Sequence, residues 1–132
     1  MNWLHYSAAS IAAGIAVSFT DWIFTGVLFH GKYLAYPEIW RKRNSEGPAI
    51  ACSALLGIVT CAAFIGACSA ATLHGYRPAL ELAGFCWLAV PVPLLVTNAL
   101  YIKIHPLVVC SHALGWLVRL VLAAVAAGRL LS

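Results

Sequence analysis

Residues 49–73 read AIACSALLGIVTCAAFIGACSAATL, a stretch without a single charged side chain. At 1.5 Å per residue, a helix of this length crosses the roughly 30 Å hydrocarbon core of a bilayer. Three further stretches are similarly long and mostly apolar, at residues 7–29, 78–102 and 107–131. The sequence therefore predicts an all-α integral membrane protein, a four-helix bundle that forms a single domain over residues 1–132.

The composition of the 132-residue chain excludes a soluble domain. Hydrophobic residues make up 63% of it and charged residues 9%, whereas soluble domains carry about 25% charged residues. No fold of so short a chain would hide that much apolar surface from water. The net charge is +4, and the basic residues lie mainly between the apolar stretches. We therefore expect anionic lipid headgroups as partners, and no nucleic acid.

The short connections at residues 74–77 and 103–106 predict that the second, third and fourth spans are antiparallel neighbours. In the third span, Pro91 and Pro93 each remove a backbone donor, which predicts a kink. The second span carries small residues at four-residue spacing, and these let helices approach closely, either within the chain or in a homo-oligomer. They are Ala49, Ser53, Gly57 and Cys61, followed by Ala62, Gly66 and Ala70.

The basic residues also indicate an orientation. Lys32, Arg41, Lys42, Arg43 and Lys103 fall on the side of the first connection, against Arg77 and Arg129 on the other. Cytoplasmic loops are rich in Lys and Arg, so this distribution predicts a multi-pass inner (plasma) membrane protein with both termini outside the cytoplasm. The small difference leaves a dual-topology arrangement open.

The first connection, residues 31–48, has the composition of a segment lying in the headgroup region, because its aromatic and basic side chains interleave. We assign it an interfacial, lipid-facing role as a membrane anchor. A lid over a substrate and a lipid-recognition element are the alternatives. The side chains concerned are Tyr33, Tyr36, Trp40, Arg41, Lys42 and Arg43.

Two charged residues lie deep inside the predicted spans, Asp21 in the first and Arg119 in the fourth, whereas Glu81 and Arg129 lie near span ends. Counted from the cytoplasmic ends, Asp21 lies about 12 Å deep and Arg119 about 18 Å deep. Charges in hydrocarbon need partners, and an arginine side chain is long enough to bridge this difference. The sequence therefore predicts an Asp21–Arg119 ion pair.

Further polar residues fall in the same, cytoplasmic half of the spans. Thr25 shares a helix face with Asp21, and His112 shares one with Arg119. His30 and Asn98 lie near the cytoplasmic ends of their spans. We regard Asp21, Arg119, His112, Asn98, Thr25 and His30 as one candidate polar site. Polar groups of this kind either tie helices together or form a proton or substrate site.

No cofactor or metal is predicted. The five cysteines are Cys52, Cys61, Cys68, Cys86 and Cys110; they lie in apolar runs without a close pair, as expected of free thiols. A haem between His30 and His112, or a metal on Cys52, Cys110 and His112, has no supporting spacing motif. No GxSxG or HExxH sequence occurs, which makes an enzyme the less favoured class.

The chain opens with MNWL, and its first span ends in Val27-Leu28-Phe29-His30-Gly31-Lys32, with Trp40 downstream. Together with Gly115-Trp116 and Gly128, these residues resemble a bacterial family of small four-helix membrane proteins known as domain of unknown function 1761. That family has the tetrapeptide LFGK, which His30 interrupts here. The resemblance implies the four-helix fold and implies no function.

Three functions fit these observations. The first is a small oligomeric transporter or channel, in which Asp21 carries a proton and Arg119 holds an anion or tunes Asp21. The second is an accessory, sensing or lipid-binding membrane subunit, to which small-residue faces and a basic aromatic connection are equally suited. The third is a membrane-embedded enzyme acting on lipids, with His112 or His30 as general base.

Overall fold

The structure is a computed structural model that describes residues 2–40, 42 and 44–132. The described residues form helices and connections, without a strand. Besides α-helices there are a π-helix, η1, and a short 3-10 helix, η2. In chain order the elements are α1 (Trp3–Trp22), η1 (Ile23–Leu28), α2 (His30–Tyr33), η2 (Pro37–Ile39), α3 (Gly47–Ala70), α4 (Tyr76–Ala89), α5 (Pro91–Tyr101) and α6 (Pro106–Leu130).

Four helical stretches are long and apolar enough to cross a membrane, as the sequence predicts. They are Trp3–Leu28, Gly47–Ala70, Tyr76–Tyr101 and Pro106–Leu130. The first begins four residues earlier than predicted because Asn2 caps it, its side-chain oxygen accepting a hydrogen bond from the Leu4 amide at 2.9 Å.

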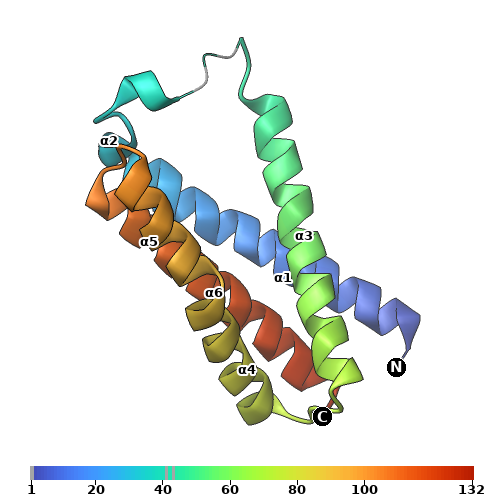
Figure 1. Ribbon diagram of the computed structural model, residues 1–132. Helices are drawn as coiled ribbons and strands as arrows, with labels where there is room; N and C mark the ends of the chain where they lie inside the picture. The colour runs from blue at the N-terminus through green and yellow to red at the C-terminus, as the bar shows by residue number, and fades with distance from the viewer. Residues whose placement is uncertain (1, 41, 43) are drawn as a thin grey trace.

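Helix α6 occupies the centre of the molecule and contacts α1, α3, α4 and α5. Helices α1 and α3 cross each other beside it (Figure 1). Both termini and the α3–α4 turn lie at one end, and α2 lies with the α5–α6 turn at the other (Figure 1). This is the arrangement required of a chain with four crossings.

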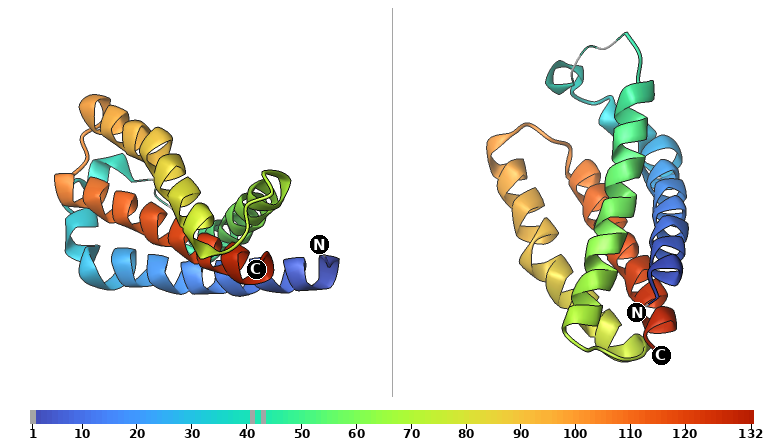
Figure 2. Two further views of the ribbon diagram at one scale, coloured as in Figure 1. Left: turned by 90° about the horizontal axis from the view of Figure 1, so that it is seen from below. Right: turned by 90° about the vertical axis from the view of Figure 1, so that its right-hand side faces the viewer.

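Helices α3 and α4 do not form the antiparallel pair that the short turn predicts. They diverge from the turn, α3 packing on α1 and α6 while α4 packs on α6 (Figure 2). The turn contains two residues in the left-handed region, Thr72 with φ 53° and Gly75 with φ 78°. The two helices pack on different partners. Gly57 of α3 lies against Val17 and the Gly14 carbonyl of α1, whereas Ala79 and Ala83 of α4 belong to the core beside α6.

The third apolar stretch is interrupted at Val90, where α4 ends and α5 begins, with φ −121° and ψ −72°. Pro91 and Pro93 follow directly, and neither has a backbone N–H to continue the ladder of α4. The prolines therefore divide the helix where the sequence places a kink. The change of direction itself stays a prediction.

The buried core lies at the end of the molecule that carries the termini. We call residues 6–17, 57–70, 76–89 and 120–130 the packed half. A Cβ added at Gly14 would lie 2.7 Å from Ile58 Cα, and one at Gly128 would lie 2.8 Å from Tyr76 Cα. Glycine is needed at both contacts because the helix backbones approach so closely.

The other end contains most of the polar candidates and little core. We call residues 18–40, 47–56, 90–101 and 105–119 the polar half. No residue of η1 or α2 is buried, and α5 buries Pro91 alone. In the polar half the helices therefore touch over less of their length and leave room for polar side chains.

Candidate functional site

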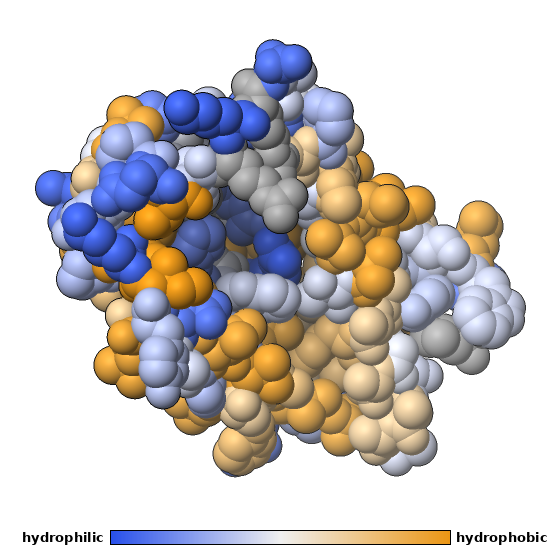
Figure 3. Space-filling model, turned by 45° about the horizontal axis from the view of Figure 1, so that its top comes forward, coloured by the Kyte–Doolittle hydropathy of each residue, from blue (hydrophilic) through white to orange (hydrophobic). Residues whose placement is uncertain are grey.

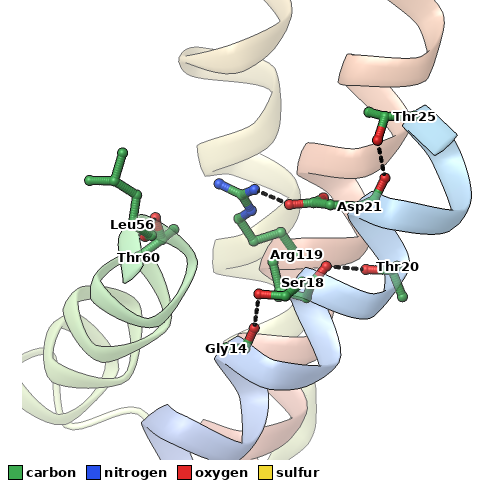
Figure 4. Close-up of polar contacts among 9 residues, drawn as sticks. Gly14, Ser18, Thr20, Asp21, Thr25, Leu56, Thr60 and Arg119 are labelled. Atoms are coloured by element: carbon green, nitrogen blue, oxygen red, sulfur yellow. Dashed lines mark hydrogen bonds and ion pairs between the residues drawn. The ribbon is translucent and has the colours of Figure 1, made fainter. Parts of the chain in front are cut away.

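Asp21 and Arg119 form an ion pair between α1 and α6, as the sequence predicts. Arg119 Nη2 lies 2.5 Å from Asp21 Oδ2 (Figure 4). The Arg119 side chain is 15% exposed and that of Asp21 32%. The arginine is thus held inside the bundle, while part of the carboxylate remains accessible at the point where the polar half meets the packed half.

Neighbouring residues of α6 shape the pair. The Arg119 guanidinium carbon lies 4.6 Å from the centre of the Trp116 ring, a cation–π contact that fixes the guanidinium plane. Gly115 lies beside the carboxylate, and a Cβ there would be 3.6 Å from Asp21 Oδ1. Arg119 Nε is buried and has no hydrogen-bond partner among the described residues.

The helix around Asp21 has unusual hydrogen bonding. Thr25 Oγ1 donates to the Asp21 carbonyl at 2.8 Å, and Ser18 Oγ donates to the Gly14 carbonyl at 3.0 Å (Figure 4). These bonds satisfy the hydroxyls within their own helix. From Ile23 to Leu28 the chain adopts a π-helix, a feature that is frequent at functional sites. Thr25 therefore contacts the backbone of Asp21, and no bond joins it to the carboxylate.

A second polar cluster joins α2 to α6. The Tyr33 hydroxyl donates to Ser111 Oγ at 3.3 Å and lies 3.3 Å from His112 Nε2. Burial raises the pKa of the Tyr33 phenol, the hydrogen bond between Tyr33 and Ser111 lowers it in part, and the Asp21 charge raises it further. Tyr33 consequently keeps its proton at neutral pH. The sequence assigns Tyr33 to the lipid interface and does not identify this cluster.

The first connection folds back onto the end of the bundle. The Trp40 indole N–H donates to the Tyr33 carbonyl at 2.6 Å. Lys103 Nζ lies 3.4 Å from Glu38 Oε1 and 4.5 Å from the centre of the Tyr36 ring. Of the predicted basic anchors, Lys42 is exposed, and Arg41 and Arg43 lie outside the described residues.

A cavity of about 630 Å³ lies between η1 and the first connection. Figure 3 shows a hollow at this end of the molecule with hydrophilic residues inside it. Polar Thr25, His30 and Tyr33 line the cavity together with apolar Leu34, Ile39 and Trp40. The cavity borders the turn of η1 that is bonded to the Asp21 carbonyl.

The six predicted site residues therefore divide. Asp21 and Arg119 form the ion pair, while Thr25 and His30 line the cavity. His112 joins Tyr33 and Ser111. Asn98 is half-buried on α5, and its side chain makes no hydrogen bond to the described residues. The site also includes three residues that sequence reasoning did not select: Ser111, Gly115 and Trp116. The available signals in the sequence are that Ser111 is adjacent to His112 and that Trp116 lies one helical turn before Arg119.

All five cysteines are free. Among the described residues, no three His, Cys, Asp or Glu side chains gather in a group that would hold a metal ion. The alternative of a metal on Cys52, Cys110 and His112 therefore has no geometric support. The chain matches no protein-family model, no curated protein and no solved structure.

Proposed function

We propose that the four long helices span the inner (plasma) membrane, with the first connection and the α5–α6 turn on the cytoplasmic side. Large apolar side chains are exposed on the helices, for example Phe85 at 71% and Leu100 at 76%. Lipid would cover these surfaces. The excess of basic residues at the first-connection end supports the orientation. Membership of the domain of unknown function 1761 family is likewise a proposal.

We further propose that the protein is a small proton-linked transporter and that Asp21 carries the proton. The Asp21–Arg119 pair carries the proposal, since it places a partly accessible carboxylate against a buried cation inside two apolar helices. Ionisable groups at membrane depth mark proton and substrate pathways. An ion pair that served only to join helices would not need a carboxylate that is partly exposed.

The cavity offers Asp21 a route to one side of the membrane. Thr25 lines the cavity and bonds to the carbonyl of Asp21, so the two features are adjacent. On the opposite side the route is closed by the packed half, where Gly14 lies directly against Ile58. Alternating access would require α1 and α3 to separate at this contact, and the interruption at Val90 supplies a place where the third span bends.

An oligomer fits this proposal. Helices α3 and α4 diverge, which leaves apolar surface on both, including Leu56 and Leu88. A second copy packed there would complete the wall of a pathway that one bundle leaves open.

The experiment is proton flux into liposomes that contain the purified protein and a pH-sensitive dye. We expect flux in the wild type and none in Asp21→Asn, which removes the titrating group and keeps its size. Glu81→Gln is the matched control, because Glu81 pairs with Arg77 at the far end of α4 and is exposed. Equal flux in wild type and Asp21→Asn would refute the proposed mechanism.

A second candidate function, a lipid-binding subunit, is favoured by the cavity itself. Its apolar residues Leu34, Ile39 and Trp40 would accept an acyl chain, and Lys32 and Lys42 nearby in the sequence would attract an anionic headgroup. Native mass spectrometry from mixed lipids tests this. Retention of phosphatidylglycerol over phosphatidylcholine, lost in Trp40→Ala, is the expected result; no preference would exclude the lipid-binding function.

A further inference from the structure

The edge of the Arg119 guanidinium that faces Asp21 is only half used. Its Nη2 donates to Asp21 Oδ2, and its Nε is buried without a partner among the described residues. In a guanidinium, Nε–H and one Nη–H are parallel and match two oxygens of a single planar anion. A buried N–H without an acceptor is destabilising. The edge is therefore suited to an anion with two oxygens. In the structure Asp21 accepts from only one of the two N–H groups.

We propose that Arg119 binds a small monovalent oxyanion through Nε and Nη2 once Asp21 has taken up a proton. The class includes carboxylates such as acetate and planar inorganic oxyanions such as nitrate. The inference rests on the proposed function and names its substrate class. The proton neutralises Asp21 and the anion replaces the lost charge, so the net charge of the site is the same in both states. Proton and anion would then cross the membrane together.

The surroundings keep Arg119 in position when Asp21 leaves it. Trp116 lies 4.6 Å under the guanidinium and belongs to the same helix, so this contact does not depend on α1. Gly115 presents no side chain to the carboxylate, where a Cβ would lie 3.6 Å from Asp21 Oδ1. The cation stays in place while its partner is exchanged.

The ionisable groups that face the pair do not supply a replacement anion. They are Cys61 of α3, His112 of α6 and Tyr33 of α2. None is a carboxylate. Protonation of His112 would add positive charge and strengthen anion binding in the same direction as protonation of Asp21.

The other acidic residues of the chain are engaged or remote. Glu38 pairs with Lys103, and Glu81 pairs with Arg77. Glu46 precedes α3 and is exposed. A neutral Asp21 therefore leaves Arg119 without a negative partner from the described chain, and that partner must come from outside it.

The test is proton uptake by the purified protein in weakly buffered detergent solution when sodium nitrate is added at constant ionic strength. We expect one proton to be taken up for each nitrate bound. Where Asp21 starts ionised, nitrate affinity should fall about tenfold per unit rise in pH, because the two ligands are linked. Chloride is a single spherical ion without oxygen atoms, so it cannot accept the two parallel N–H bonds as a planar oxyanion does, and it should bind about tenfold more weakly. Acetate, followed by thermal shift, should match nitrate.

Two variants and a control decide the assignment. Asp21→Asn should bind nitrate without proton uptake. Arg119→Lys keeps the positive charge but lacks the two parallel N–H donors, so it should lose the preference for nitrate over chloride. If Asp21→Asn does not fold, Arg119→Lys still tests the site. Arg77→Gln, at an exposed position, should behave as wild type.

Absence of proton uptake with nitrate in the wild type would overturn the inference, and so would an unchanged nitrate preference in Arg119→Lys. Proton flux without nitrate-linked uptake would overturn the oxyanion site and leave proton transport standing. Uptake without flux would support the oxyanion site and refute transport.

Discussion

The packed half and the polar half of the molecule are built from the same four helices but differ in how closely these approach. All members of the buried core cluster lie in the packed half. Most of that core is alanine, cysteine and large apolar side chains, and glycine permits the closest approaches, Gly14 to Ile58 and Gly128 to Tyr76. One side-chain bond, from the Tyr6 hydroxyl to the Ala62 carbonyl, also joins α1 to α3 there. In the polar half the helices are joined by side-chain bonds, those of Arg119 to Asp21 and of Tyr33 to Ser111.

In the proposed membrane-spanning arrangement, this difference would hold the bundle together at one end and leave an exchangeable site at the other. Apolar surface gives no driving force between helices in lipid, so close backbone contact holds the packed half together. Polar side-chain bonds hold the polar half, and each can be exchanged for a bond to water or to an ion. Segments with few buried contacts are those that open first.

The largest effect should come from Gly14→Leu in the packed half. The new side chain would meet Ile58 at the α1–α3 crossing, and such overpacking costs about 3 kcal/mol or more where neither backbone can yield. Unfolding in detergent, followed by circular dichroism, measures the loss. Gly84→Leu is the matched control, since a Cβ at Gly84 meets nothing within 4 Å. Gly84 also lies in the packed half but away from any close helix contact, so equal losses in the two variants would show that the α1–α3 contact at Gly14 has no special part in stability.

The next largest effect concerns the ion pair at the boundary of the two halves. Asp21→Leu and Arg119→Leu should each destabilise by about 2 kcal/mol, because each leaves a charge without its partner in a partly buried place. The double variant should lose less than the sum of the two. A double-mutant cycle measures this coupling.

The exposed Arg77–Glu81 pair serves as the comparison for that cycle. As an i,i+4 pair on a helix surface, it should show a coupling of only about 0.3 kcal/mol. If the Asp21–Arg119 coupling were no larger, the pair would contribute nothing special to the polar half.

A smaller effect is expected for Tyr33→Phe, which removes the bond to Ser111 and the contact with His112. The loss should be about 1 kcal/mol, confined to the first connection and α2. Hydrogen exchange of the amides in residues 31–40 should become faster, with the core unchanged. Tyr36→Phe is the control, because the ring of Tyr36 contacts Lys103 and is retained. Equal exchange in both variants would show that the hydroxyl of Tyr33 does not hold the connection.

The smallest effect should come from Glu38, at the outer edge of the polar half. A backbone hydrogen bond chiefly lowers its pKa, and Lys103 adds to this. A lowered pKa means that the stabilisation is present above the unfolded value of 4.5 and is lost as pH falls through the folded pKa. Acidification below pH 4.5 should therefore speed hydrogen exchange in residues 36–40, and Glu38→Gln should remove that acid step. A step that persists in Glu38→Gln would belong to another group.

The sequence alone predicts the helices and the ion pair, because both follow from quantities that are read along the chain. The apolar stretches set the number of long helices, and Asp21 pairs with Arg119 because their charges are opposite and the arginine side chain is long enough to bridge their difference in depth. The Arg77–Glu81 contact follows in the same way from i,i+4 spacing.

Properties that depend on rotation about a helix axis, or on the path of an irregular connection, are not predictable in this way. Turn length suggests that α3 and α4 pack on each other, yet α3 packs on α1 and α6 and α4 packs on α6. The position of Tyr33 depends on how α2 follows η1, and no periodicity encodes that path. The sequence therefore places the polar groups at one depth but does not separate them into a pair and a cluster.

The central claim is that the Asp21–Arg119 pair is an exchangeable proton site in an otherwise tightly held bundle. Infrared difference spectroscopy of the reconstituted protein during acidification tests it directly. We predict a reversible carbonyl band of a protonated carboxyl group that is present in wild type, absent in Asp21→Asn and increased by nitrate. If no such band appears over the pH range in which the protein stays folded, Asp21 and Arg119 only tie α1 to α6, and the account is wrong.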